Sequence, residues 1–166
     1  MKQLVIALLL TTCFDLSSQE LISCPPLMEE ASTLPLSATL KLEQNGFLYL
    51  DLDDRYIHDL IKWIEERGFE KPAYFGNGLV GAHITIVMPD EWEGTPPADF
   101  SEMEVFFTLK ECRIVHALKK SEISEYFLII VEAPSLHEVR ENYNLPPPPF
   151  DFHITIGVKK SLIACN

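Results

Sequence analysis

Two identical tetrapeptides carry the residues of this chain that are best suited to chemistry. The sequence His-Ile-Thr-Ile occurs at residues 83–86 and again at residues 153–156, an offset of 70 residues. Alternate side chains of a β-strand point to opposite faces, so each copy would place its His and Thr on one face and its two Ile side chains on the other. We therefore interpret His83, Thr85, His153 and Thr155 as one shared catalytic site.

A pair of histidines of this kind is suited to general acid and base catalysis. Imidazole titrates near pH 6.5, so at neutral pH one ring can accept a proton while the other donates one. Cleavage of a phosphodiester needs both roles, and the two Thr hydroxyls could donate hydrogen bonds to the phosphoryl oxygens as negative charge develops there. This chemistry requires no metal ion and no cofactor, and the sequence does not assign the acid and base roles.

The residues before the first copy predict a hairpin, a helix and a strand. Runs at 38–43 and 47–50 flank Gln44-Asn45-Gly46, and an Asn-Gly pair between β-prone runs favours a tight turn. Apolar residues at helical spacing predict a helix from Asp53 or Asp54 to Gly68, followed by a strand at 83–88.

A similar order of elements precedes the second copy. Three β-prone runs at 103–109, 112–118 and 126–131 are followed by a helix at 135–143 and a strand at 152–158. The sequence therefore predicts two similar halves, each ending in a His-Ile-Thr-Ile strand.

The paired motifs resemble the two HxTx signatures of the two-histidine (2H) phosphoesterase superfamily, which includes 2′,5′ RNA ligase-like proteins and cyclic nucleotide phosphodiesterases. The resemblance spans about residues 38–160, and we take residues 38–166 as the domain. It implies an α+β fold that is bilobed and pseudo-twofold, in which two antiparallel sheets face a central cleft and the helices lie outside.

The resemblance implies a phosphodiesterase acting on a small cyclic phosphodiester such as a 2′,3′-cyclic nucleotide. Three alternatives stay open at this point. The first is an RNA-end 2′,3′-cyclic phosphodiesterase or a 2′,5′ RNA ligase-like enzyme. The second is a secreted nucleotide-binding protein without turnover, and the third is a zinc protein in which a carboxylate joins the two histidines.

The loop at residues 71–81 is the best source of substrate-binding residues. It contains Gly76, Gly78 and Gly81 beside aromatic residues, and it leads directly into the first motif. We expect Tyr74 or Phe75 to stack on a base and Lys71 to meet a phosphate.

The charge of the chain limits the size of its partner. The 13 Lys and Arg against 25 Asp and Glu give a net charge of −12, whereas binding to long nucleic acid depends on many cationic contacts with phosphates. The sequence predicts a small nucleotide or an RNA end as ligand, no long nucleic acid, and a monomer.

The N-terminus has the features of an export signal. Lys2 precedes an unbroken apolar run at 4–10, so residues 1–20 are interpreted as a signal segment, with Cys13 as a candidate lipoprotein cysteine. The protein would then be periplasmic, secreted or lipid-anchored, with membrane contact only through lipidation at Cys13. Without a working signal it would be cytoplasmic. Residues 21–37 are expected to form an extended lead-in, and a disulfide between Cys24 and Cys165 is possible.

Overall fold

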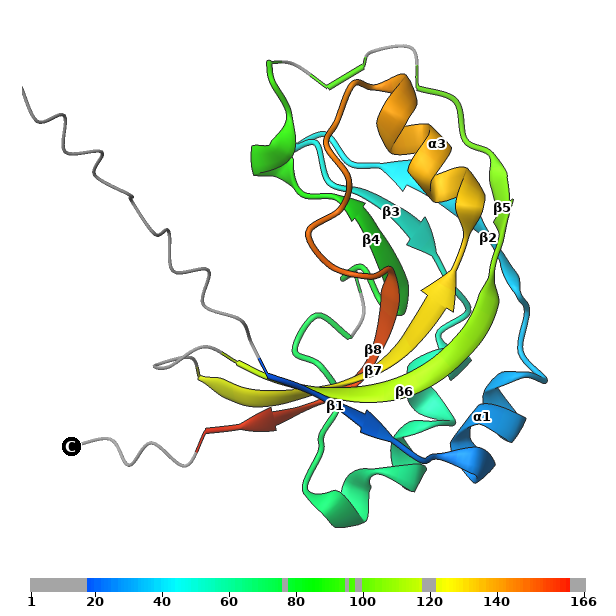
Figure 1. The fold of residues 1–166 in the computed structure, drawn as a ribbon, viewed down its shortest axis with the longest axis vertical. Helices are drawn as coiled ribbons and strands as arrows, with labels where there is room; N and C mark the ends of the chain where they lie inside the picture. Colours follow the sequence, from blue (N-terminus) through cyan, green and yellow to red (C-terminus); the bar gives the residue numbers. More distant parts are fainter. Residues whose placement is uncertain (1–17, 76–77, 95, 98–99, 118–121, 162–166) are drawn as a thin grey trace, which may run out of the picture.

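The computed structural model describes residues 18–75, 78–94, 96–97, 100–117 and 122–161. One sheet of eight antiparallel strands dominates it, in the order β1-β6-β7-β8-β4-β3-β2-β5. Figure 1 shows that this sheet is strongly curved. Its strands are β1 (Gln19–Ile22), β2 (Ser37–Leu42), β3 (Leu48–Asp51), β4 (His83–Val87), β5 (Glu104–Phe106), β6 (Thr108–His116), β7 (Ile123–Glu132) and β8 (His153–Lys160).

Three short helices pack against this sheet. The helix α1 (Pro25–Ala31) contacts β6, α2 (Arg55–His58) contacts β8, and α3 (Pro134–Asn142) contacts β4 and β5 (Figure 1). Three single turns of 3-10 helix complete the described secondary structure, at Ile61–Trp63, Glu65–Arg67 and Pro89–Glu91. No helix within the described ranges is long and apolar enough to cross a membrane.

The two predicted halves are present, but they do not form separate sheets. The units β2-β3-α2-β4 and β6-β7-α3-β8 follow each other in the chain, and their motif strands β4 and β8 meet at the centre of the sheet. These strands pair only at Ile84 and Ile154. Beyond this position the edge of β8 pairs with Glu70, so the two motif strands diverge. The expected arrangement of two sheets facing a cleft is thus replaced by one continuous, bent sheet.

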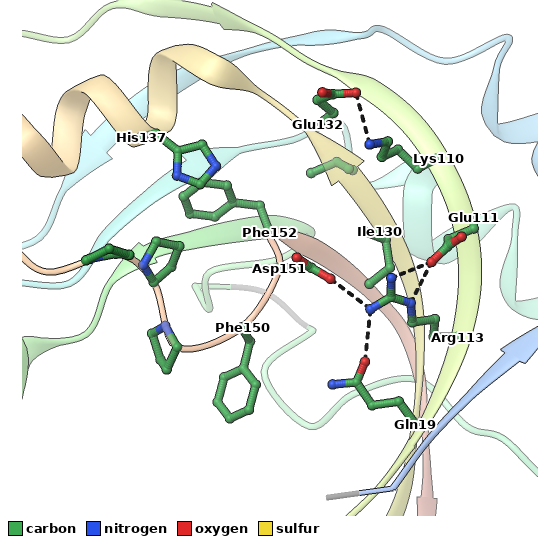
Figure 2. A pocket seen from close by; sticks show the side chains of 14 residues that line it. Gln19, Lys110, Glu111, Arg113, Ile130, Glu132, His137, Phe150, Asp151 and Phe152 are labelled. Carbon is green, nitrogen blue, oxygen red and sulfur yellow. Dashed lines mark hydrogen bonds and ion pairs between the residues drawn. The ribbon is translucent and has the colours of Figure 1, made fainter. Parts of the chain in front are cut away.

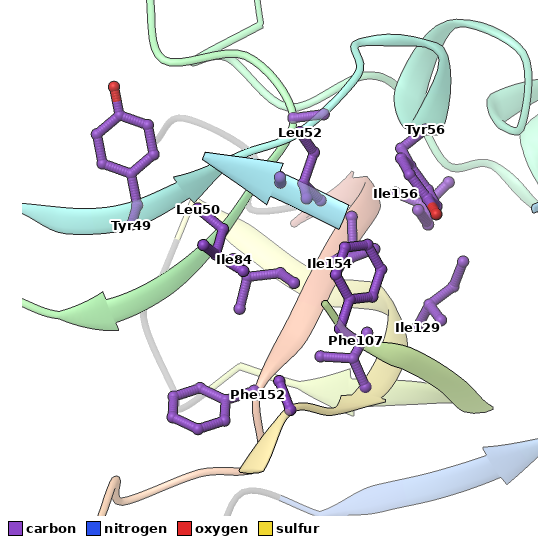
Figure 3. Close-up of a cluster of buried hydrophobic side chains, with 14 of the residues drawn as sticks. Tyr49, Leu50, Leu52, Tyr56, Ile84, Phe107, Ile129, Phe152, Ile154 and Ile156 are labelled. Carbon is purple, nitrogen blue, oxygen red and sulfur yellow. The ribbon is translucent and has the colours of Figure 1, made fainter. Parts of the chain in front are cut away.

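The apolar residues of both motifs lie in the core, as the alternating pattern predicts. Ile84, Ile86, Ile154 and Ile156 are all buried, and Figure 3 shows Ile84 and Ile154 among side chains from β3, β7 and the segment between β5 and β6. Burial of an Ile side chain contributes about 1.5–3 kcal/mol each. The motif residues therefore hold the sheet together with one face and leave the other face for chemistry.

The predicted hairpin is confirmed. Strands β2 and β3 pair antiparallel with Leu42 opposite Leu48, and Gly46 takes the left-handed conformation with φ of 92°. The Asn45 side chain accepts a hydrogen bond from the Phe47 amide at 2.9 Å, which closes the turn. The Asn-Gly pair therefore acts as the sequence indicated.

The helix predicted up to Gly68 is less regular than expected. It consists of the short α2 followed by two 3-10 turns, although Gly68 ends it in the left-handed conformation with φ of 85°. In a 3-10 helix residues three apart lie on one side, and the Cδ1 atoms of Ile61 and Ile64 both rest over Gly157 of β8. A Cβ atom at Gly157 would approach Cδ1 of Ile64 to 2.9 Å, so a larger residue at this strand position would force the two Ile side chains to shift.

The expectation of an extended lead-in at residues 21–37 is wrong. Strand β1 adds to the edge of the sheet beside β6, and α1 follows it. Pro25 and Pro26 occupy the first helical positions, where the missing amide of proline costs no hydrogen bond, so these prolines start a helix rather than prevent one. The predictions made for Lys2, residues 4–10 and Cys13 concern positions outside the described residues.

The cysteine pairing also differs from the prediction. Cys24 forms a disulfide with Cys112 of β6, so a bond from Cys24 to Cys165 is excluded in this structure. The pairing of β1 with β6 puts Ile22 opposite Cys112, which brings Cys24 within reach two residues later. This bond ties the N-terminal segment to a strand 88 residues further along the chain.

A buried arginine links the end of β4 to the loop before β8. Arg140 of α3 is only 1% exposed. Its guanidinium donates hydrogen bonds to the carbonyl oxygens of Ile86 and Pro146 and to the Glu91 carboxylate. Glu91 in turn accepts a hydrogen bond from the Met88 amide at 2.8 Å. Burial raises the pKa of Glu91, but the hydrogen bonds from Arg140 and Met88 outweigh it and hold the pKa below its ordinary value.

Loss of the disulfide should lower the free energy of unfolding by about 2–5 kcal/mol, because the bond restricts the unfolded chain over a long loop. Denaturant unfolding of the Cys24→Ser and Cys112→Ser variants measures this change. The free energy of unfolding should fall by the same amount in both single variants and in the double variant. Reductant should lower it by that amount in the parent protein and leave the variants unchanged. Unequal losses, or no loss, would contradict the pairing.

Replacement of Arg140 by Met should lower the free energy of unfolding by about 3 kcal/mol or more, since it leaves the Glu91 carboxylate and two carbonyl oxygens without their donor. The matched control is Arg55→Met, which removes an exposed ion pair with Asp53 and should cost less than about 1 kcal/mol. Equal losses in the two variants, measured by denaturant unfolding, would show that the Arg140 network contributes little.

Candidate active site

The four polar motif residues lie on one face of the two central strands. Each of them is partly exposed, whereas the intervening Ile residues are buried. Because β4 and β8 run in opposite directions around the Ile84–Ile154 pair, His83 lies next to Thr155, and Thr85 lies next to His153. The structure thus brings the predicted catalytic residues together as two His-Thr neighbours related by the pseudo-twofold arrangement.

Both histidine rings are fixed by the same contact with the backbone. The Nδ1 atom of His83 lies 2.8 Å from the Gly81 carbonyl oxygen, and that of His153 lies 2.8 Å from the Asp151 carbonyl oxygen. A carbonyl oxygen can only accept a hydrogen bond, so Nδ1 must carry the proton in each ring. In a neutral ring this leaves the Nε2 lone pair free, and in a protonated ring it leaves an Nε2 proton to donate.

A glycine makes the contact at His83 possible. Gly81 has φ of 74°, a backbone conformation that L side chains rarely adopt. A Cβ atom there would also collide with the Asp54 carboxylate, which accepts a hydrogen bond from the Ala82 amide at 3.0 Å. Asp54 therefore fixes the chain immediately before the first motif, and Gly81 directs its carbonyl oxygen toward His83.

An ion pair supports the corresponding segment before the second motif. The Asp151 carboxylate accepts a hydrogen bond from Arg113 of β6 at 2.8 Å, while the Asp151 carbonyl oxygen holds His153. Arg113 also pairs with Glu111. The second histidine is thus positioned by charged side chains where the first is positioned by a glycine turn.

Three aromatic rings surround His83. The ring centroids of Phe47, Tyr49 and Tyr74 lie 5.7, 6.0 and 4.9 Å from that of His83. Burial raises the pKa of Tyr49 to about 12, and its hydrogen bond to Glu43 contributes in the same direction, so this ring is neutral. Burial among these rings disfavours a charged imidazole at His83, while Asp51, which lies opposite His83 in β3, acts in the other direction.

Tyr74 is the one proposed substrate-binding residue that the structure brings to the motifs. Its ring packs against His83, and the Thr155 side chain lies near enough to its hydroxyl to lower the pKa of Tyr74, against the larger effect of burial. Burial raises the pKa of Tyr74. Tyr74 thus links a histidine of one half to a threonine of the other.

Lys71 and Phe75 lie together with a third histidine. The Lys71 ammonium is 2.9 Å from Nδ1 of His58 and 5.6 Å from the centroid of the Phe75 ring, and the His58 and Phe75 rings contact edge to face. These contacts are with one another and with His58, and their role in substrate binding stays a prediction.

Comparison with known families agrees with this geometry. Residues 48–164, well over half of the chain, match the family model described as Swiss Army Knife, 2H phosphoesterase domain. The chain belongs to the 2H phosphoesterase family. Neither the curated proteins nor the solved structures that were compared with it gave a significant match. The resemblance inferred from the two motifs is therefore confirmed at the level of the superfamily.

Phe47 and Tyr49 of this 2H phosphoesterase were not singled out from the sequence. They alternate along the chain around β3, and the pairing of β3 with β4 places Tyr49 opposite Thr85. The alternation of aromatic residues is visible in the sequence, but the pairing of β3 with β4 is needed to bring them beside His83. Among the described residues, no group of three or more His, Cys, Asp or Glu side chains is arranged to hold a metal ion.

The surroundings of both histidines lower their pKa values from 6.5. Burial is the largest cause in each case. The charge of His153 further lowers the pKa of His83, while the hydrogen bonds to Gly81 and Asp151 act in the opposite direction. A 2H phosphoesterase with these rings can hold one neutral and one protonated imidazole most readily in mildly acidic solution.

The pH dependence of kcat/KM should be bell-shaped with its maximum below pH 6.5. The form with one proton on the pair is populated only near the two lowered pKa values, and its fraction falls as the pH rises toward about 8. Rates measured from about pH 4.5 to about pH 8.5 at constant ionic strength test this expectation. An optimum above about pH 7 would contradict it.

Proposed function

We propose that this 2H phosphoesterase is a metal-independent phosphodiesterase acting on a small cyclic phosphodiester such as a 2′,3′-cyclic nucleotide. The observation that carries the proposal is the pair of imidazoles on one face of adjacent strands, each with Nδ1 bound to a carbonyl oxygen. This anchoring commits both Nε2 atoms to proton transfer, which is the requirement for acid and base catalysis on one phosphorus atom.

In the proposed reaction the neutral imidazole takes a proton from water as the water oxygen bonds to phosphorus. The protonated imidazole gives its Nε2 proton to the ribose oxygen as the bond between that oxygen and phosphorus breaks. The products are a phosphomonoester and a free hydroxyl, and the two rings exchange one proton with solvent to return to their starting state. Thr85 and Thr155 donate hydrogen bonds to the phosphoryl oxygens, where negative charge increases in the transition state.

The charges around the sheet support a small substrate. The cations Lys41, Arg113, Lys159 and Lys160 all pair with carboxylates. Lys119 and Lys120, the other adjacent basic pair of the sequence, lie outside the described residues. A long polyanion needs a row of available cations, and the net charge of −12 opposes it further. We therefore propose a nucleotide-sized ligand.

The disulfide supports export as the location of the enzyme. Disulfides persist in oxidising compartments and are rare in reducing cytosol, so the Cys24–Cys112 bond is consistent with a periplasmic, secreted or lipid-anchored protein. Location is a proposal that fractionation of the producing cells would test.

Hydrolysis of a panel of 2′,3′-cyclic nucleotides in excess chelator should test the activity. His83→Ala and His153→Ala should each lower kcat by about 10²–10⁴-fold, because each removes one proton-transfer group. The matched control is His116→Ala, a partly exposed histidine at the end of β6 and outside the motifs, which should retain the parent rate.

Three outcomes would contradict the proposal. Loss of activity in chelator would point to a bound metal, and equal activity of the parent and both motif variants would exclude the two histidines. Preference for oligonucleotides with cyclic ends over mononucleotides would move the substrate to RNA ends.

A further inference from the structure

A pocket of about 590 Å³ opens beside the second motif, between the strands β6 and β7 and the loop that enters β8 (Figure 2). Pockets for small organic ligands commonly range from about 300 to 1,000 Å³. Its lining comes from Gln19, Lys110, Glu111, Arg113, Ile130, Val131, Glu132, His137, Pro147, Pro148, Pro149, Phe150, Asp151 and Phe152. The pocket is therefore large enough for one ring system of a nucleotide.

The strand register places part of the pocket on the catalytic face of the sheet. Ile130 of β7 lies directly opposite His153, and Arg113 lies opposite Leu128, which itself pairs with Thr155. Neighbouring strands are about 4.8 Å apart, so the pocket begins roughly one strand spacing from His153. Asp151 belongs to both sites, since its carbonyl oxygen holds His153 and its carboxylate lines the pocket.

One wall of the pocket is rigid and ends in an exposed aromatic ring. Pro147, Pro148 and Pro149 fix the backbone of this wall because each proline locks φ. Phe150 follows them with 60% of its surface exposed. Figure 2 shows its ring directed away from Phe152 and His137. The ring centroids of Phe152 and His137 lie 4.9 Å apart, so these two side chains pack on each other. A stiff loop that presents a solvent-exposed ring is suited to stacking on a planar ligand.

The charges of the pocket do not favour a second phosphate. Three carboxylates and two cations line it, and both cations are already paired: Lys110 with Glu132 at 3.1 Å, and Arg113 with Glu111 and Asp151. The three carboxylates are the partners in these pairs, but each carboxylate has more acceptor sites than these pairs occupy, so its oxygens can also accept hydrogen bonds from hydroxyl and amino groups. The lining thus suits an uncharged ring that carries such groups.

We propose that this pocket binds the nucleoside part of the substrate, with its base stacked on Phe150 and its hydroxyl or amino groups bonded to the pocket carboxylates. This inference rests on the proposed function for the position of the phosphodiester at the two histidines. It adds that the substrate carries an uncharged, hydrogen-bonding ring on the β7 side of His153 and that no further phosphate follows in this direction.

Direct binding of nucleosides without phosphate tests the pocket independently of turnover. Adenosine, guanosine, cytidine and uridine are titrated into the parent protein by calorimetry, and at least one should bind. Phe150→Ala should weaken that binding roughly tenfold or more, since a stacked base contributes about 1–3 kcal/mol. Phe150→Tyr keeps a ring and should retain most of the affinity.

The matched control is Phe106→Ala. Phe106 is also a phenylalanine on the surface, 69% exposed, but it lies on β5 at the far edge of the sheet. Its substitution should leave nucleoside binding unchanged. Binding should also vary little with salt, because an uncharged ligand makes no charge pairs that salt could screen.

The experiments distinguish a wrong pocket proposal from a wrong phosphodiesterase proposal. If no nucleoside binds, or if Phe150→Ala and Phe106→Ala behave alike, the pocket proposal is overturned even when cyclic nucleotides are hydrolysed. If nucleosides bind through Phe150 but no cyclic phosphodiester is cleaved, the pocket stands and the phosphodiesterase proposal falls. If both hold, Phe150→Ala should raise KM for cyclic nucleotides roughly tenfold or more with little change in kcat.

Discussion

A single pair of buried residues, Ile84 and Ile154, joins the two halves of the described sheet. Their antiparallel pairing sets the position of every polar motif residue, because the neighbours of each Ile must then face the neighbours of the other. The same short motif therefore supplies both cohesion and chemistry. Its isoleucines pack into the core while its histidines and threonines share the opposite face, so a shift of one residue in this register would bury the polar groups and expose the apolar ones.

The two halves present identical motifs in different surroundings. His83 is enclosed by aromatic rings and receives its backbone contact from a glycine turn, whereas His153 lies next to an ion pair and a pocket. Burial lowers the pKa of both rings, and a pocket large enough for a ring system lies on the β7 side of His153. The two motif strands thus place two equivalent histidines on one face of the sheet, and the residues around them make the two sides of the candidate site different.

Local patterns in the sequence predicted much of this architecture. The repeated His-Ile-Thr-Ile, the Asn45-Gly46 turn and the order of elements depend on neighbouring residues. The structure confirms the two motif strands and the hairpin, and the family model confirms the superfamily. Most of the errors concern long-range partners, whereas the missed helix at Pro25–Ala31 is a local error, because prolines at the first helical positions are a signal that the sequence contains. The bond of Cys24 to Cys112 depends on the pairing of β1 with β6, and the single sheet depends on one contact between β4 and β8. Phe47 and Tyr49 were missed for the same reason, since their place beside His83 follows from a strand register that no local pattern contains.

The central position of β8 has a consequence for how the molecule is assembled. β8 is the last strand of the sheet in chain order, yet it inserts between β4 and β7, and β1 must find β6 across a similar distance along the chain. Contacts between residues so far apart slow folding, because the entropy of closing long loops is lost before the contacts form. Until residues 153–160 are in place, β4 and β7 are open edges with apolar side chains, and such edges readily pair with other chains. The interval before β8 docks is therefore the stage at which this protein is most exposed to aggregation and most dependent on chaperones.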